Sequence, residues 1–562
     1  MEKLQTGTVR SQKAISSDLF EPLEQRRLFA VSLNAAGWIV VTPASNSRVV
    51  YVSSSVGNDR NSGLAPSLPV QTLGKAVSLL RNGYGDEMLL RRGDVWHDSL
   101  GVWWKSGASE QDPLLIGAYG VGARPLLDTG TADAFDCGET SHPIVNNIVI
   151  DGIAFQADGH NPSSLTFDRK ASPDGIHLVS QTTNFTIEDC TLEYYVNNIT
   201  MVNYFGPISH VAIERCNISY SFSSTGAHSE GTFLEGVQGI QLMGNVYDHD
   251  GWDTAGGGYA TIFNHDVYVT ATSSGLVARG NIFAEASSHG LQARCGGSIE
   301  DNVFLDDPTG LSFGLVNGSP VTPGGVTGDV VGNLFIGGRN INPSLPRGTG
   351  LEIGNTYTAT VADNLFADNP TSEFPAIELG YGTDDSNPTD AAGLNDVTFN
   401  DNVIYNWGYG IESAAGLVPD STGPKSLNNV SFIDNEIQQI TSGDIVTQGG
   451  VLNTNTEHWS GNVYNTNSTT ATPFSINHVS ESSAHWLAKV DPTGKLKKAS
   501  FPNAGATMSS YDASLSLAST DTAILAAAAT QSQQSWNARF TTSDILSYFH
   551  SAFGGGLDGK LV

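Results

Sequence analysis

Residues 265–294 read HDVYVTATSSGLVARGNIFAEASSHGLQAR and contain the pattern that decides the fold. The short strand HDVYVT is followed by a strand that ends in an Asn turn, GLVARGNIF, and HGLQAR then repeats the first strand 24 positions on. A chain that returns to one pattern at this interval winds into a solenoid. Parallel strands of neighbouring turns lie about 4.8 Å apart. We therefore expect His265 to lie beside His289, and Tyr268 beside Gln292.

One strand type ends in a turn that contains asparagine. Asparagine tolerates the left-handed backbone of such a turn, and stacked side-chain amides can hydrogen-bond along a ladder. Cys190 and Cys216 fall in the same column, 26 residues apart, and we interpret them as buried ladder residues rather than as a disulfide. The asparagines of this column are Asn245, Asn281, Asn302, Asn333, Asn364, Asn402, Asn435 and Asn462.

The other strand type has apolar residues at its third and fifth positions, which we expect to point into the solenoid. Its fourth and sixth positions then point outward. Inward ladders of Ile, Leu and Val over roughly ten rungs bury enough surface to hold a long body, and the crossover rule makes it right-handed. The outward fourth positions are His177, Thr200, Phe233, Tyr268, Gln292, Ser312, Glu352, Glu378 and Glu412.

The predicted fold class is all-β: a right-handed parallel β-helix with an N-terminal capping helix and C-terminal helices. We expect residues 1–46 to be a leader or targeting segment without regular structure, and residues 47–145 to form the cap and the first coils. Residues 146–466 are the predicted β-helix body, and residues 467–562 a C-terminal extension that lies on the solenoid or seals its far end. Helices are predicted near Leu73–Leu80, at Ser519–Trp536 and at Thr541–Gly555.

Two segments near the N-terminus resemble known families. A strand, a loop with SVGND, a helix and the strand GDEMLLRRGD follow one another from Arg48, and PLLIGAYGVGARPLLD follows at residues 113–128. This order resembles the entrance of right-handed parallel β-helix proteins of the pectate-lyase-like superfamily. The segment FEPLEQRRLFA, residues 20–30, resembles the LEP-x-x-R-x-L-L-type leader of exported planctomycete proteins. The second resemblance implies export to the cell surface, the periplasm or the exterior.

The formal net charge is −30 and the pI about 4.6, which argues against nucleic acid and anionic membranes as partners. Acidic loops can instead bind Ca²⁺, the one cofactor that the composition suggests. The four cysteines lack the spacing of a zinc site, and no apolar run is long enough to span a membrane. We expect an exported monomer whose partner is a polysaccharide.

Histidine, tyrosine, arginine and carboxylate side chains are concentrated on three middle rungs and in the long loop between Asn245 and His265. Loops that interrupt a solenoid commonly form the rim of its binding face, and a tryptophan suits the apolar face of a sugar ring. The predicted catalytic residues are His265, Tyr268, His289, Arg294 and His249. The predicted substrate-binding residues are Gln292, Trp252, Glu235, Asp250, Asp253, Asp266 and Glu230.

This mixture suits β-elimination on an acidic polysaccharide, the chemistry that the superfamily resemblance also implies. Removing the proton next to a uronate carboxylate requires a base, a proton donor for the leaving oxygen and a cation to neutralise the carboxylate. His265 or His289 can be the base, Tyr268 the acid or a second base, and Arg294 with Gln292 the carboxylate clamp. Lyases that resemble alginate lyase use a Lys/Arg pair, whereas this region has no lysine.

Two alternatives remain open at this stage. A glycoside hydrolase needs paired carboxylates, for which Asp250, Asp253, Asp266, Glu230 and Glu235 are candidates. A non-catalytic carbohydrate-binding or adhesion protein would need only the polar face. Glu352, Glu378 and Glu412 are interpreted as a solvated acidic stripe or as Ca²⁺ contacts.

Overall fold

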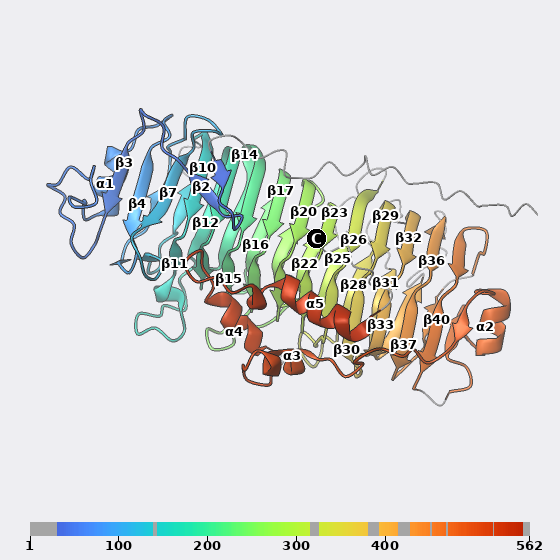
Figure 1. Cartoon of the computed structure of the whole chain (residues 1–562). Coiled ribbons are helices and arrows are strands. Elements are labelled where there is room, and N and C mark those ends of the chain that lie inside the picture. The colour runs from blue at the N-terminus through green and yellow to red at the C-terminus, as the bar shows by residue number, and fades with distance from the viewer. Residues whose placement is uncertain are drawn as a thin grey trace, which may run out of the picture.

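The structure is a computed structural model that describes residues 31–138, 143–314, 325–379, 393–413, 427–449, 452–467, 470–520 and 522–554. The predicted leader motif at residues 20–30 lies outside these ranges. The chain is a right-handed parallel β-helix, as predicted, and its strands stack into one elongated body (Figure 1). No helix in the described ranges is both long and apolar enough to cross a membrane.

The strands form three rows, named here row 1, row 2 and row 3. The long strands β12 (Asp174–Glu188) and β14 (Asn197–Glu214) run through a corner and belong to both row 1 and row 2. Row 1 further contains β6 (Gly101–Val102), β9 (Phe135–Cys137), β16 (Glu230–Glu235), β19 (His265–Val269), β22 (His289–Ala293), β25 (Thr309–Phe313), β28 (Thr349–Ile353), β31 (Pro375–Leu379), β34 (Tyr409–Ser413), β38 (Val446–Gln448) and β41 (Phe474–Ile476), with β42 (Val479–Glu481) antiparallel to β41.

Row 2 further contains β3 (Val49–Val52), β4 (Glu87–Arg91), β7 (Leu114–Tyr119), β10 (Val145–Asp151), β17 (Val237–Met243), β20 (Ser274–Arg279), β23 (Gly297–Glu300), β26 (Val326–Val331), β29 (Thr356–Ala362), β32 (Leu394–Asn400), β35 (Leu427–Asn428), β36 (Val430–Ile433) and β39 (Glu457–Ser460). Row 3 contains β5 (Val95–Trp96), β8 (Leu126–Asp128), β11 (Ala154–Gln156), β13 (Thr191–Glu193), β15 (Asn217–Ser219), β18 (Val246–Asp248), β21 (Ile282–Ala284), β24 (Val303–Leu305), β27 (Leu334–Ile336), β30 (Leu365–Asn369), β33 (Val403–Trp407), β37 (Glu436–Ile440), β40 (Val463–Thr466) and β43 (Lys495–Leu496).

The predicted register is confirmed. His265 pairs with His289, and Tyr268 pairs with Gln292, in parallel between β19 and β22. Inside the solenoid, row 3 contributes a stack of phenylalanine rings whose centroids are 4.5 Å apart between Phe335 and Phe366. Apolar residues of all three rows form one continuous core along the bore.

The Asn ladder lies at the corner between row 2 and row 3. Each Nδ2 donates to the Oδ1 of the next asparagine, from Asn245 to Asn462, at 2.9–3.0 Å. The ladder ends where Asn462 Nδ2 donates to Asp491 Oδ2 at 2.9 Å. Cys190 and Cys216 are buried and free, as the column predicts.

Both ends of the solenoid are covered. Helix α1 (Leu73–Leu79) packs Leu73 and Ala76 on the core beside β3, at the predicted cap. Helix α2 (Ser483–Lys489), which the sequence pattern did not predict, covers the other end through Trp486 (Figure 1). The Trp486 ring stacks on Phe474, with 4.7 Å between the centroids.

The C-terminal extension lies on the outer face of row 3. Its elements are α3 (Met508–Ser514), α4 (Ala523–Ala529), the 3₁₀ turn η4 (Ala538–Phe540) and α5 (Thr542–Phe553). Figure 1 shows α5 running along the long axis of the solenoid, across the strands, and Ile545 and Phe549 pack in one cluster with Ile282 and Leu305 of row 3. The helix predicted at Ser519–Trp536 is therefore confined to α4, and α3 is an additional short helix.

The first described residues form a hairpin rather than an irregular leader. Strands β1 (Val31–Leu33) and β2 (Ile39–Val41) pair antiparallel. Ile39 packs on Leu115 and Val149 on the outer face of row 2, and its N–H donates to Glu188 at 2.8 Å. The predicted leader boundary at residue 46 thus falls after a segment that is packed on the solenoid.

Candidate active site

The outward face of row 1 carries a buried histidine held by a glutamate. His265 starts β19, and Glu230 starts β16 one rung earlier. The Oε2 atom of Glu230 accepts the backbone N–H of His265 at 2.7 Å and lies 2.9 Å from its Nδ1. Because one oxygen accepts both groups, we assign the Nδ1–H tautomer to His265. Its Nε2 lone pair is then available to accept a proton.

Three further side chains surround His265. The ring centroids of His265 and His289 are 5.0 Å apart, and those of His265 and Tyr268 are 5.1 Å apart. The guanidinium carbon of Arg294 lies 4.9 Å from the centre of the Tyr268 ring. The structure thus brings four of the five predicted catalytic residues together.

Burial determines the protonation of this group. Burial, together with the positive charges of Arg294 and His228, lowers the pKa of His265 to about 3. Burial and the neighbouring cations also lower the pKa of His289 well below its usual range. Burial raises the pKa of Tyr268, although Arg294 opposes the shift. Both imidazoles are therefore neutral and the phenol is protonated at neutral pH.

The fourth-position column continues into an acidic segment. Gln292 is 5% exposed, and its Oε1 has no hydrogen-bond partner among the described residues. Further along, Glu352, Glu378 and Glu412 are in register on successive strands. Burial and the charges of Glu352 and Glu412 raise the pKa of Glu378 to about 8. This column is thus half-buried rather than a fully solvated stripe.

Sequence reasoning missed two basic residues of this face. Arg347 contributes to the low pKa of His289 and opposes the rise that burial causes in the pKa of Glu352, and His228 contributes to the low pKa of His265. Each precedes the first residue of its row 1 strand by two positions, His228 before Glu230 and Arg347 before Thr349. That shared position is the signal in the sequence that would have identified them.

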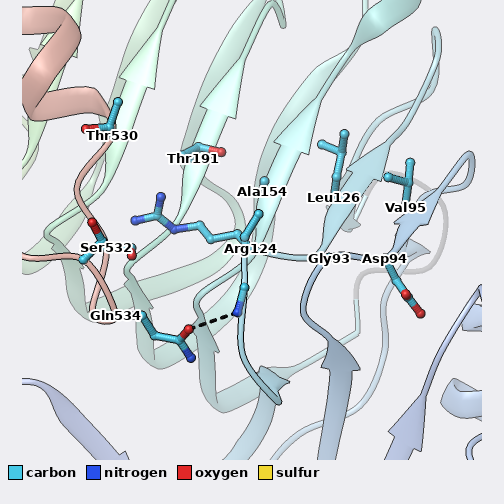
Figure 2. A pocket seen from close by; sticks show the side chains of 13 residues that line it. Gly93, Asp94, Val95, Arg124, Leu126, Ala154, Thr191, Thr530, Ser532 and Gln534 are labelled. Carbon is cyan, nitrogen blue, oxygen red and sulfur yellow. Dashed lines mark hydrogen bonds between the residues drawn. The ribbon is translucent and has the colours of Figure 1, made fainter.

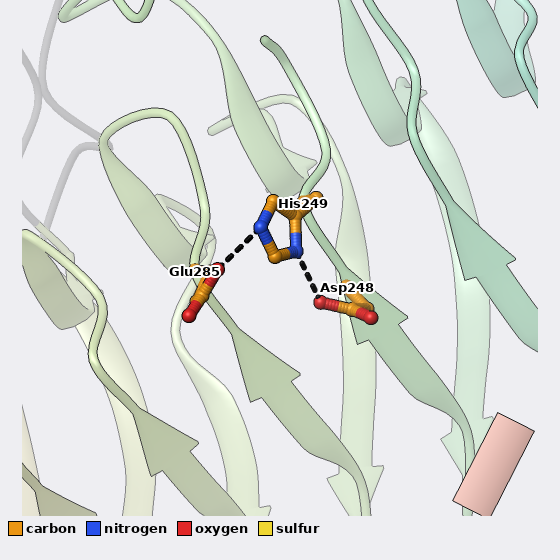
Figure 3. Close-up of side chains that lie close together, drawn as sticks. All are labelled: Asp248, His249 and Glu285. Carbon is orange, nitrogen blue, oxygen red and sulfur yellow. Dashed lines mark hydrogen bonds and ion pairs between the residues drawn. The ribbon is translucent and has the colours of Figure 1, made fainter. Parts of the chain in front are cut away.

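His249 lies at the corner between row 3 and row 1, apart from the His265 group. Its Nδ1 is 2.6 Å from Asp248 Oδ1, and its Nε2 pairs with Glu285 Oε2 (Figure 3). Burial alone would lower the pKa of His249, but the hydrogen bonds to Asp248 and Glu285 outweigh burial and raise it to about 10. Because both ring nitrogens are bound to carboxylates, His249 is poorly suited to act as a base.

Asp248, His249 and Glu285 are also a candidate metal site. In the described part of the chain, no other three His, Cys, Asp or Glu residues have ligand atoms that all lie within 4.8 Å of one another. Ca²⁺ prefers six to eight oxygen ligands. The triad offers two carboxylates and one imidazole, and the protonated imidazole already neutralises the carboxylates. Its donor set therefore does not fit Ca²⁺, and the Ca²⁺ expectation gains no support here.

Four predicted substrate-binding residues have structural contacts instead. Asp250 and Asp266 are fully buried behind row 1, and Asp266 accepts the backbone N–H groups of Asp250 and Ala284. Asp253 accepts two N–H groups within its own loop. Trp252 donates to Glu285 O at 2.7 Å and stacks on His249, so it packs at the corner. The sequence could not show this, because the corner geometry decides which way each side chain points.

Glu235 is half-buried at the end of β16 and lies near enough to Tyr268 to raise the pKa of that phenol. It is the one hydrolase candidate, besides Glu230, that remains on the row 1 side.

A cavity of about 660 Å³ lies elsewhere, where the C-terminal extension crosses row 3 (Figure 2). Its charged residues are already paired: Arg124 with Asp189 at 2.6 Å, and Asp94 with Ser55 at 2.7 Å. Figure 2 also shows Gln534 accepting the N–H of Gly122 at 3.3 Å. The cavity is a packing gap between the extension and the solenoid and contains no group suited to catalysis.

No protein-family model and no curated protein matches the chain. Among solved structures, the tailspike protein of E. coli bacteriophage HK620 has 14% sequence identity and a TM-score of 0.43, covering 80% of this chain and 78% of its own. A mannuronic acid specific polysaccharide family 6 lyase from human gut microbiota has 12% identity and a TM-score of 0.42, covering 83% and 94%. GH136 lacto-N-biosidase from Eubacterium ramulus has 14% identity and a TM-score of 0.35, covering 80% and 68%. At these values the likeness concerns the fold alone.

Proposed function

We propose that the protein is an exported polysaccharide lyase that binds an acidic glycan across row 1 and cleaves it by β-elimination. The observation that carries this proposal is the neutral His265, held by Glu230 at 2.9 Å, with Tyr268 and Arg294 beside it. Elimination needs a base, an acid and a cation around one sugar ring, and these residue types meet within two rungs.

The proposed reaction assigns one role to each side chain. Arg294 and Gln292 bind the uronate carboxylate and stabilise the charge that develops on it. Nε2 of His265 takes the proton from the carbon next to that carboxylate, and the electron pair forms the new carbon–carbon double bond. The bond to the leaving glycosidic oxygen breaks, and Tyr268 donates its phenolic proton to that oxygen. Proton transfer from His265 back to Tyr268 restores the resting state.

The bound substrate is part of the proposed chemistry. A base with a pKa of about 3 is weak, because efficient bases titrate near the working pH. A uronate carboxylate next to His265 offsets the positive charge of Arg294, one of the causes of the low pKa, and so raises the imidazole pKa. The site is thus more basic when its anionic substrate is present.

A glycoside hydrolase is the second candidate, and the acidic column supports it. Glu352 and Glu378 lie on adjacent strands, and burial raises the pKa of both, that of Glu378 to about 8. Two neighbouring carboxyl groups can serve as the acid and the base of a glycosidase. Asp250 and Asp266, two of the five carboxylates that the sequence offered as acid and base, are fully buried and are not carried forward.

Incubation with a panel of polyuronates and other acidic glycans tests the proposal. A lyase gives an unsaturated uronate that absorbs in the ultraviolet. New reducing ends without that absorbance would indicate the hydrolase, and binding without cleavage would indicate a carbohydrate-binding protein.

The variants His265→Gln and Arg294→Ala should each lower kcat about 10²- to 10⁴-fold. Glutamine can still donate to Glu230, which limits the structural cost of the first variant. His458→Ala and Arg279→Ala are the matched controls, since both residues lie on row 2, and they should retain full activity. Equal loss in the controls, or full activity in His265→Gln, would reject the assigned roles.

A further inference from the structure

His289 is a second proton acceptor on row 1, and the proposed reaction leaves it unused. Its Nδ1 lies 2.7 Å from Oγ of Ser288. The same Oγ lies 2.9 Å from the carbonyl oxygen of Asn264, which can only accept a hydrogen bond. The Ser288 hydroxyl therefore donates to Asn264 and accepts the Nδ1–H of His289. This tautomer leaves a lone pair on Nε2 of His289.

Glu352 faces this lone pair from two strands away. Its Oε2 lies 3.9 Å from Nε2 of His289, which is too far for a hydrogen bond. Between their strands, β22 and β28, lies β25, whose first and fourth positions are the short side chains of Thr309 and Ser312. The longer side chains of His289 and Glu352 thus approach each other over β25. Both stay accessible, since 14% of the His289 side chain and 16% of the Glu352 side chain are exposed.

These groups require a ligand that donates hydrogen bonds. Nε2 of the neutral imidazole can only accept, and the carboxyl of Glu352 accepts in either protonation state. Three positions after His289 on the same strand, the buried Oε1 of Gln292 is a further acceptor without a partner among the described residues. A carboxylate has no hydrogen to donate, and the charges of Arg294 and Arg347, which act on His289, disfavour a cation. Neighbouring hydroxyl groups of a sugar meet the requirement.

We infer that His289 and Glu352 form a hydroxyl-binding subsite, which holds two neighbouring free hydroxyl groups of the sugar that follows the uronate towards β28. This inference rests on the proposed function, because it takes the His265 group as the place where the uronate binds. Neighbouring strands are about 4.8 Å apart, so a subsite over β25 is within reach of the next sugar along the chain. Gln292 can serve both sugars, since its amide nitrogen donates to the uronate carboxylate while its oxygen accepts a hydroxyl.

Equilibrium binding to the His265→Gln variant tests the inference without interference from turnover. The probes are alginate and polygalacturonate oligosaccharides of equal length, each unmodified and O-acetylated, measured by calorimetry. Acetylation removes the hydroxyl donors but keeps the carboxylates, so we expect it to weaken binding at least about tenfold. Adding His289→Phe or Glu352→Ala should weaken binding of the unmodified probe and reduce the effect of acetylation to less than about threefold. The matched control is His458→Phe, at an exposed histidine on row 2, which should leave the effect of acetylation unchanged.

The outcomes separate the two proposals. No binding by any probe, no effect of acetylation, or an effect that is equally large after His289→Phe and after Glu352→Ala would overturn the inference. Either of these two substitutions decides the test if the other prevents folding. If acetylation acts as expected but the wild-type protein forms no unsaturated product from any probe, the lyase proposal fails and the subsite stands. If the wild-type protein forms that product while acetylation acts equally on all variants, the lyase proposal stands and the inference fails.

Discussion

Nδ1 of His265 is hydrogen-bonded to Glu230, so only Nε2 can accept a proton from a substrate. The pKa of this group is about 3 in the free protein, and an anionic substrate should raise it. We therefore expect different acid limbs in the two kinetic profiles, because kcat/KM reports the free enzyme and kcat the complex. The apparent pKa from kcat should be the higher of the two, with kcat/KM flat from about pH 5 to neutrality.

Steady-state kinetics over the range in which the protein stays folded would measure both limbs. An acid limb of kcat/KM near the ordinary histidine value of about 6.5 would contradict the buried, neutral assignment. Tyr268 is expected to contribute no limb below about pH 10, since burial raises its pKa.

The buried carboxyl of Asp250 should make the stability of the protein depend on pH. Burial raises its pKa from 3.8 to about 8. Between these values the folded state keeps a proton that the unfolded state has released, so this group makes the free energy of unfolding fall as pH rises from about 4 to about 8. Asp250→Asn does not titrate, and its Oδ1 can still accept from Ser221 N–H and Asn198. When the pH is raised from about 5 to about 8, the Tm of the variant should therefore fall less than the Tm of the wild type.

Thermal unfolding followed by circular dichroism at both pH values would measure this difference. Asp401→Asn is a suitable control, because Asp401 lies at the Asn ladder corner and is only half-buried. An identical pH slope in Asp250→Asn and the wild type would show that Asp250 ionises normally in the folded protein.

At the scale of single elements, the end helix α2 protects the last coil through one side chain. Trp486 is fully buried, stacks on Phe474 and meets Trp459 edge-on at 5.3 Å. Trp486→Ala removes most of this contact and exposes the last core layer, so we expect a loss of about 3–5 kcal/mol in the free energy of unfolding. Urea denaturation of the C-terminal rungs would measure it. Trp104→Ala should cost far less, since half of that side chain is already exposed; equal losses would mean that α2 is not a cap.

The sequence predicted the strands better than the connections between them. Strand rows follow from a repeat in which apolar and polar positions alternate, and a period of two leaves little freedom in register. Helix α5 was predicted because its Thr start, Gly stop and apolar spacing are all present. Helices α2 and α3 have seven residues each and lie beyond the repeat, and no pairing of a Ser or Thr start with a Gly stop marks them as it marks α5. Arg347 and His228 lie in the connections that lead into row 1 strands. The conformation of these connections follows no periodic pattern in the sequence, so the positions of the two side chains were not predicted.

At the scale of the whole molecule, the three rows have different surroundings. Row 3 is covered by the C-terminal extension, and the N-terminal hairpin packs on row 2, whereas row 1 presents the His265 group. The N-terminal hairpin and the C-terminal extension also meet: the rings of Trp38 and Trp536 contact edge to face with 5.1 Å between centroids. This long-range closure was not predictable, because neither tryptophan lies in a repeat. The location of the candidate site on the middle rungs was predictable, since the repeat alone stacks its histidines.

The Asn ladder also has an electrical consequence. Every side-chain amide in it points the same way, with its N–H towards the C-terminal end, so the amide dipoles add along the axis as peptide dipoles do in a helix. The carboxylate of Asp491 sits at the positive end of this array. The last coil is thus closed by charge complementarity as well as by packing, and a side chain of opposite sign at that position would be repelled by the whole column.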